Sequence, residues 1–177
     1  MAGRTPVLLL PLLVALTLAG CRREPDEGRV FSAISDGNVV ALTEELDKGY
    51  DVSKLNLLDR QAHMTPVHAA AMAGHIEVLR LLLDRGLKVD LQTDDGATLL
   101  MVTAGAAQID AMKFLVQRGA DVNALNYGKT GHVTAIEMAC GNKHLDAVNA
   151  LIDAGARIDG YRSAYCRQAG LEVPVTR

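Results

Sequence analysis

The sequence predicts an all-α repeat protein: a solenoid of about four helix-turn-helix units followed by a capping half-unit at the C-terminal end. Its 177 residues are 49% hydrophobic, which is enough to bury the core of one modest domain. Two residue types recur at the same two intervals of 33 and 36 residues: Gly86, Gly119 and Gly155, and Thr65, Thr98 and Thr134. Apolar residues between these marks are spaced as on one face of a helix. A unit of this length buries its apolar face only by stacking on a neighbour, so the repeat predicts a solenoid.

The N-terminal 20 residues differ from the repeats and are typical of a secretory signal. Residues 7–18 form an apolar run behind Arg4, which is shorter than the roughly 20 residues that a membrane-spanning helix needs. The run ends in Leu-Ala-Gly-Cys at 18–21, which resembles the lipobox of bacterial lipoproteins. That resemblance implies cleavage of a signal peptide at 1–20 and attachment of lipid to Cys21. The alternative is an ordinary signal peptide whose cleavage region contains a cysteine.

Residues 21–27 are expected to be a lipidated cysteine and a short charged tether. At about 3.3 to 3.6 Å per extended residue, the tether reaches only about 20 Å, so the repeats would stay close to the lipid headgroups. Arg22 stands where the inner-membrane retention signal of many Gram-negative lipoproteins has Asp, and this resemblance implies the outer membrane, facing the periplasm. Arg22 and Arg23 would either form a solvated linker or pair with anionic lipid.

The second unit shows how each unit is expected to fold. Thr65 stands where a helix N-cap is favoured, and Pro66 takes the first helical position. Small alanines follow at 69–71, which would let the next unit approach closely. The apolar spacing predicts a second helix over 76–84, and Gly86 is placed for a left-handed C-terminal cap.

The other units follow the same pattern less strictly. An earlier unit places Gly37 and Gly49 each 37 residues before their counterparts in the second unit. The third and fourth units lose the proline and the histidine but keep the apolar spacing. The loop at 54–64 is longer than the period allows. Residues 161–170 predict the first helix of a further unit, which would cover the end of the stack, and 171–177 are expected to be a flexible tail.

The second unit resembles the ankyrin repeat. Residues 65–86, which begin with TPVHAAAMAGH, match the family pattern almost position by position, and residues 119–123, which read GADVN, match it again. The resemblance covers about residues 28–159, and we place the repeat domain at 28–170. It implies a solenoid that binds protein partners through a concave face made of loop tips and first helices.

Composition and motifs argue against other classes of function. A net charge of -3 without a stripe of Lys and Arg argues against nucleic-acid binding, and only 3% of the residues are aromatic. The chain has no nucleophile elbow, phosphate loop or zinc-protease motif, so we predict no enzyme, no cofactor and no small-molecule substrate. Cys140 and His144 could share a helix face, but two ligands do not make a metal site. His68 and His75 stand where ankyrin repeats use structural histidines.

Two cysteines remain besides Cys21, in what would be an oxidising compartment. On the ankyrin register, Cys140 and Cys166 take neighbouring alanine positions in the last full unit and in the half-unit. Adjacent first helices could bring them together, and a disulfide would then hold the C-terminal cap. The alternative is two buried small residues, since equivalent positions in adjacent units usually lie about 10 Å apart, beyond the Cα separation of a disulfide.

The ankyrin register places eight residues on the face that would meet a protein partner: Met72, Gln92, Asp94, Asp95, Tyr127, Lys129, His132 and Asn142. Tyr127 is the expected anchor, because tyrosine is enriched at binding hot spots and this one lies in an enlarged loop. The adjacent carboxylates at 94 and 95 would suit a basic patch on the partner.

Ankyrin repeats behind a lipobox resemble the immunity lipoproteins that Gram-negative bacteria pair with lipase effectors of type VI secretion systems. The resemblance implies capture of a phospholipase at the membrane that it attacks, so that its access to lipid is blocked. One alternative is a periplasmic scaffold without inhibitor activity, similar to ankyrin proteins linked to oxidative-stress resistance. A further alternative is an enzyme that uses His63 and His132.

Overall fold

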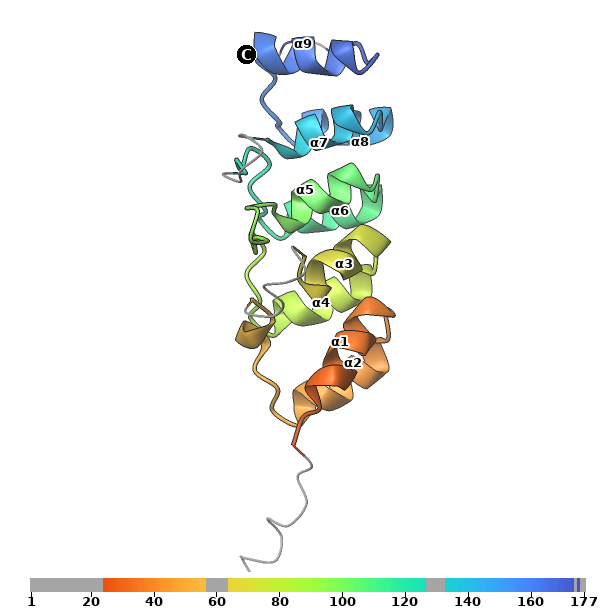
Figure 1. Cartoon of the computed structure of the whole chain (residues 1–177), viewed down its shortest axis with the longest axis vertical. Helices are drawn as coiled ribbons and strands as arrows, with labels where there is room; N and C mark the ends of the chain where they lie inside the picture. The colour runs from red at the N-terminus through yellow and green to blue at the C-terminus, as the bar shows by residue number, and fades with distance from the viewer. Residues whose placement is uncertain (1–23, 57–63, 127–132, 174, 176–177) are drawn as a thin grey trace, which may run out of the picture.

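Four pairs of helices stack into an elongated solenoid, and a further helix covers its C-terminal end (Figure 1). The computed structural model describes residues 24–56, 64–126, 133–173 and 175. Within these residues the elements follow in this order: α1 (Glu27–Ser35), α2 (Val39–Asp47), the 3-10 helix η1 (Val52–Asn56), α3 (Pro66–Ala73), α4 (Ile76–Asp84), α5 (Leu99–Gly105), α6 (Ile109–Gln117), α7 (Ala135–Gly141), α8 (Leu145–Asp153) and α9 (Gly160–Gln168). The predicted all-α repeat solenoid with its capping half-unit is therefore confirmed.

In the second, third and fourth units, the N-cap of the first helix is a threonine. The hydrogen bonds that this threonine makes differ from unit to unit. Thr65 is the N-cap of α3 and Pro66 is its first helical residue, as predicted. In the fourth unit, Oε2 of Glu137 accepts hydrogen bonds from the backbone N–H and from the hydroxyl of Thr134, at 2.8 and 2.7 Å. A carboxylate three residues after the cap thus replaces the lost proline and histidine, so the helix still begins at the same position.

The core lies between the two rows of helices and continues from unit to unit. Ala70 of α3 and Leu82 of α4 have no exposed surface, and the counterparts of Leu82 in the next two units, Leu115 and Leu151, are equally buried. Alanine on the first helices lets neighbouring units approach closely, because it has no side chain beyond Cβ. First and second helices both supply large buried side chains, so no unit can be removed without exposing its neighbour's core.

Side chains also join successive units where each first helix turns into the second. Three of them donate a hydrogen bond to the carbonyl at the equivalent position of the preceding unit: His75 Nε2 to Ser35 O (3.1 Å), Gln108 Nε2 to Met72 O (3.1 Å) and Asn142 Nδ2 to Gly105 O (2.8 Å). These carbonyls lie at the C-terminal ends of α1, α3 and α5, where no helical N–H remains to bind them. The hydrogen bonds therefore fix the spacing of the units along this edge.

The N-terminal end of the stack is closed by a buried carboxylate. Glu45 takes the position that Leu82 holds in the second unit, and it is fully buried. Its carboxylate accepts hydrogen bonds from Lys48 Nζ (2.7 Å) and from the backbone N–H of Asp26 (2.8 Å), and it pairs with Arg29 at 3.2 Å. The hydrogen bonds from Lys48 and Asp26 lower the pKa of Glu45 against the opposing effect of burial. A charged network thus covers the end of the apolar core.

The C-terminal end is closed by α9. The structure joins Cys140 of α7 to Cys166 of α9 in a disulfide whose Cα atoms are 5.0 Å apart. Cys166 lies one position beyond the counterpart of Cys140, so the wider spacing of strictly equivalent positions does not apply. Leu171 and Val173, within the segment expected to be a flexible tail, pack against the core. The Val173 carbonyl also accepts a hydrogen bond from the Ser163 hydroxyl at 3.1 Å, so the chain folds back along α9.

Candidate functional site

A hollow of about 330 Å³ opens among the loops that lead from the second and third units. We call it the loop-tip hollow, and its lining residues are Asp90, Gln92, Thr98, Asp121, Asn123, Ala124 and Leu125. The chain turns tightly between two lining residues, Gln92 and Thr98: the Thr93 N–H donates to the Ala97 carbonyl at 2.9 Å and Gly96 has a φ of 80°. Among the residues predicted to bind a partner, Gln92 lies in this hollow.

Hydrogen bonds between units hold the loop-tip hollow in shape. Oδ1 of Asp90 accepts from the backbone N–H of Asp121 at 3.1 Å. One unit further along, Oδ1 of Asn123 accepts from the Arg157 N–H at 2.8 Å, and its Nδ2 donates to the Gly155 carbonyl at 3.2 Å. The same position of the repeat thus ties each loop to the next. A partner would meet a surface that is already ordered, which reduces the entropy lost on binding.

The loops around this hollow carry an excess of negative charge. Segments 86–98 and 119–126 contain one basic residue, Lys88, against four aspartates: Asp90, Asp94, Asp95 and Asp121. Asp94 is exposed and Asp95 is half-buried. A partner with a basic patch would therefore be attracted to this surface, as expected for the pair at 94 and 95.

Met72 and Asn142 lie at the other end of the first helices, by the helix–helix turns. Met72 is 46% exposed and is available to an apolar partner. Asn142 is exposed, but its amide already donates to the Gly105 carbonyl, so this residue also links two units. The described residues predicted to bind a partner therefore do not form one patch.

The remaining predicted binding residues, Tyr127, Lys129 and His132, lie outside the described residues, as does the predicted lipidation site Cys21. All four stay predictions. None of the helices in the described part of the chain has the length and apolar character that crossing a bilayer requires.

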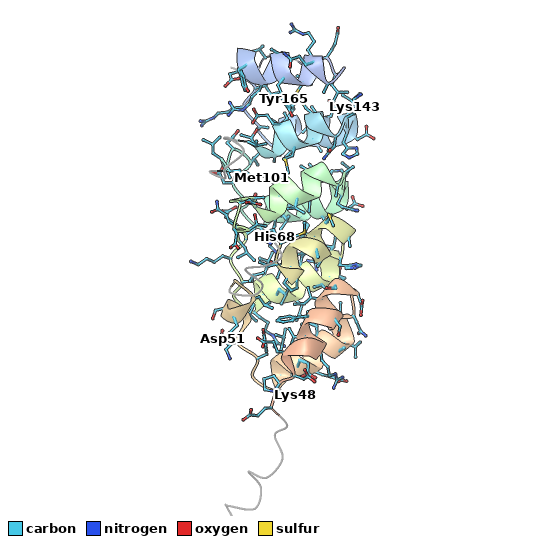
Figure 2. The ribbon with its side chains drawn as sticks, viewed as in Figure 1. Lys48, Asp51, His68, Met101, Lys143 and Tyr165 are labelled. Carbon is cyan, nitrogen blue, oxygen red and sulfur yellow. A yellow bond between two sulfur atoms is a disulfide. The ribbon has the colours of Figure 1, made fainter. Side chains whose placement is uncertain are left out.

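His68 is a structural residue in the interior of the second unit (Figure 2). Its Nε2 lies 3.1 Å from the Leu91 carbonyl and must donate, and Nδ1 lies 2.7 Å from the Thr65 hydroxyl. In the neutral ring, whose proton is then on Nε2, Nδ1 accepts from that hydroxyl. Burial lowers the pKa of His68 to about 4, although the backbone hydrogen bonds of Leu91 and Ala97 oppose the shift. The side chain thus connects the start of α3 to the following loop.

Metal chemistry finds little support in the described ranges. No group of three or more His, Cys, Asp or Glu side chains there is arranged to hold a metal ion. Cys140 is joined to Cys166, so its sulfur cannot act with His144 as a thiolate ligand.

A second hollow, which the sequence does not predict, lies between α6 and α8. It is a groove of about 480 Å³, and we call it the α6–α8 groove. Its lining residues are Ile109, Met112, Lys113, Val116, Gln117, Asp146, Asn149, Ala150, Leu151, Asp153 and Ala154. One feature of the sequence indicates this groove: when the second helices are aligned, Ala150 and Ala154 replace Phe114 and Arg118 of the preceding unit.

Comparison with known proteins agrees with this architecture. A family model described as ankyrin repeats (3 copies) matches residues 30–126 and 88–162. The probable E3 ubiquitin-protein ligase XBOS31 of Oryza sativa subsp. japonica is 30% identical over 141 residues, which are 79% of this chain and 30% of the relative. The probable 26S proteasome regulatory subunit p28 of Saccharomyces cerevisiae is 33% identical over 88 residues, 44% of this chain and 39% of the relative.

The human ankyrin repeat and KH domain-containing protein 1 is 35% identical over 95 residues, which are 54% of this chain and 4% of that protein. The chain thus spans less than a third of the rice relative and a small part of the human one. What these proteins share with it is the stack of repeats. Since the family model covers most of the chain and the helix pairs repeat as it requires, the chain belongs to the ankyrin-repeat family, whose repeats serve as protein–protein interaction modules.

Proposed function

We propose that this ankyrin module is anchored to a bacterial outer membrane through Cys21 and binds and inhibits a secreted phospholipase. The observation that carries the binding part is the ordered, acidic loop-tip hollow. Its shape is set by hydrogen bonds between units, and its aspartates would steer a basic patch on the partner toward it. The lipobox-like sequence and the resemblance to immunity lipoproteins support the membrane and the partner.

The proposed inhibition is steric. Each CH₂ group of a lipid chain adds about 0.8 kcal/mol of membrane affinity, so two or three chains would hold the module at the surface that a phospholipase attacks. A rigid stack that binds beside the lipase active site would keep the enzyme from its substrate. No catalytic group is needed in such a mechanism.

The named relatives support the binding module alone. Two of their names refer to a ubiquitin ligase and a proteasome subunit, and those activities belong to chains of which this one covers 30% and 39%. The part that is shared is the repeat stack, so no ligase activity is proposed for this chain.

Anchoring is tested by comparing the wild-type chain with Cys21→Ser after expression in a Gram-negative host. We expect the wild type in the outer-membrane fraction and the variant in the soluble periplasm. An equal distribution of the two would reject the lipid anchor.

Inhibition is tested with a phospholipase whose gene adjoins the gene for this chain, as the proposal expects. We expect the purified chain to slow hydrolysis of phospholipid vesicles, and Asp94→Lys to weaken that effect. Asp36→Lys, which reverses an exposed charge next to α1, is the matched control and should inhibit like the wild type. Unchanged hydrolysis at saturating chain would reject the inhibitor, and a peroxide-sensitive deletion strain would then favour the periplasmic scaffold.

A further inference from the structure

The α6–α8 groove lies between the second helices of the third and fourth units. Apolar side chains from both helices form its floor, among them Met112, Val116, Ala150 and Leu151. Its volume of about 480 Å³ is large enough for a large side chain and part of a neighbouring one. Residues at loop tips do not contribute to it, so it is separate from the loop-tip hollow.

The interface one unit earlier shows what fills this space elsewhere in the stack. There Phe114 of α6 lies between the second helices, and the guanidinium carbons of Arg80 and Arg118 are 4.7 and 5.1 Å from its ring centroid. Arg118 reaches back to Asp84 of α4 at 2.6 Å. The contribution of α6 to its contact with α4 is therefore one aromatic ring and one arginine, and α4 adds Arg80.

In the next interface, both of these side chains are missing. Ala150 takes the position of Phe114, Ala154 takes that of Arg118, and Gln117 takes that of Asp84. The groove is the space that the two alanines leave while the backbone spacing of the units is kept. Its shape thus matches a ring and a long cationic side chain.

The charges at the rim favour a cation. Asp146 and Asp153 of α8 line the groove from the same side of their helix, and Lys113 of α6 lies opposite. Both carboxylates are exposed, and neither has an ion-pair or hydrogen-bond partner among the residues that the structure describes. Because Gln117 takes the position of Asp84, a guanidinium or ammonium group in the groove would pair instead with Asp153, which lines the groove next to Ala154.

We propose that the α6–α8 groove is a second protein-binding site, which receives an aromatic side chain and a neighbouring arginine or lysine from a partner protein. The partner supplies the two groups that Phe114 and Arg118 supply one unit earlier. The ring packs on Met112, Val116 and Ala150, and the cation pairs with Asp153. Aromatic and arginine side chains in desolvated pockets are the residues that most often dominate binding energy. This site does not depend on the lipase hypothesis.

A labelled peptide gives a defined probe of the groove. The peptide is an alanine-based helix with Phe and Arg four residues apart, the spacing of Phe114 and Arg118, and its control has Ala and Gln at those two positions. Fluorescence anisotropy with the full chain should give a dissociation constant of about 1 mM or tighter, and at least tenfold weaker binding of the control peptide. Equal affinity for the two peptides would overturn the proposal.

A variant of the chain whose own side chains fill the groove tests the site most directly. Ala150→Phe combined with Ala154→Arg places the ring and the arginine of the preceding interface in this one, so the variant should stay folded and lose at least tenfold in peptide affinity. Asp153→Lys alters only an exposed side chain and should also lose affinity, which keeps the test valid if the double variant misfolds. Asp36→Lys is the matched control and should bind normally. Normal binding by Asp153→Lys and by the folded double variant would overturn the site.

Self-association is the competing occupant. Sedimentation of the wild-type chain and of the filled variant tests it without the peptide. We expect both to sediment as monomers over the same concentration range. An oligomer that is lost on filling would show that a second copy of this chain occupies the groove, and would overturn the assignment to a different partner.

Discussion

The interface between α4 and α6 and the interface between α6 and α8 are built on the same backbone repeat, yet one is filled and the other is open. In the first, Phe114 and two arginines complete the contact. In the second, Ala150 and Ala154 leave a groove of about 480 Å³. The two interfaces differ in the residues at these positions, a ring and an arginine in one and two alanines in the other. A repeat stack can therefore open a pocket at one interface without altering its neighbours.

In the C-terminal half a covalent bond joins the last unit to the capping helix, whereas in the N-terminal half ion pairs join successive units. Arg85 pairs with Asp47 at 2.8 Å between the first two units, and the third unit repeats this pair. The fourth unit has no such pair in the described residues, but the disulfide of Cys140 and Cys166 ties it to α9. The two halves share one apolar core but add different links between neighbouring elements, and substitutions can separate the contributions of these links.

The largest effect is expected from removing the disulfide. Cys140→Ala with Cys166→Ala should lower the free energy of unfolding by about 3.5 kcal/mol, because the bridge closes a loop of 26 residues in the unfolded chain. Alanine occupies the position of Cys140 in the two preceding units, so the packing is preserved. Denaturant unfolding measures the loss.

Hydrogen exchange shows where that loss falls. Amides of α9 should exchange faster in the double variant, whereas those of α3 and α4 should keep their protection, because each unit contacts only its neighbours. Reduced wild type is the control and should behave like the variant. Uniform loss of protection along the stack would contradict the division into halves.

A second large effect is expected where the earlier interface is emptied. Phe114→Ala makes the α4–α6 contact resemble the open one and should cost about 3 kcal/mol, since a 7%-exposed ring and its contacts with two arginines are lost. Chemical denaturation gives the value. Ala150→Phe is the reciprocal control, and a loss as large as that of Phe114→Ala would show that the groove cannot accept a ring.

Most of the fold could be predicted because the residues that recur in each unit have specific roles in local structure. Threonine at the helix start and glycine at the helix end recur at the same two intervals, and both act within a few residues of their own position. The alanines at 69–71 and the apolar spacing over 76–84 indicate the faces that are buried, and Ala70 and Leu82 on these faces are fully buried in the structure. Local rules of this kind need no knowledge of the rest of the chain.

The α6–α8 groove could not be predicted in the same way. Ala150 and Ala154 are ordinary helix residues, and only comparison with Phe114 and Arg118 across the stack shows that volume is missing. The role of Asn142 was also hidden, because its acceptor is the Gly105 carbonyl, 37 positions earlier in the chain. Such contacts depend on how two units meet, which no single repeat encodes.

Acid should weaken the second unit through His68. Its pKa is about 4 in the folded chain, against 6.5 for an unperturbed histidine, so the unfolded state binds the proton first as the pH falls below 6.5. Stability is complete above pH 6.5 and is lost toward pH 4, with a decrease of about 2 kcal/mol between pH 7 and pH 5. Unfolding free energies measured across this range give the slope.

His68→Met is the matched control for the pH effect, because Met101 takes the same position in the third unit (Figure 2). This variant should be less stable at pH 7 but should lose less stability between pH 7 and pH 5. A slope identical to that of the wild type would show that other groups cause the acid sensitivity.

The smallest effect is expected at the turns between first and second helices. Gly74 has a φ of 77°, and a Cβ added there would lie 2.5 Å from Oε1 of Gln108. Gly74→Ala should cost about 1 kcal/mol, from the left-handed backbone and the displaced hydrogen bond of Gln108 to Met72. Thermal or denaturant unfolding resolves a change of this size.

The third unit already contains the substitution that Gly74→Ala would introduce. Ala107 has a φ of 54°, and the link to the carbonyl of the preceding unit comes from Asn142, two positions before the residue that matches Gln108. A Cβ at this turn would collide with a donor at the position of Gln108, so the donor comes from a position two residues earlier. Ala107→Gly should therefore change stability by less than about 0.5 kcal/mol, since relief of strain and greater freedom of the unfolded chain oppose each other. A large loss of stability in Ala107→Gly, with none in Gly74→Ala, would contradict this explanation of why Asn142, and not the residue that matches Gln108, is the donor.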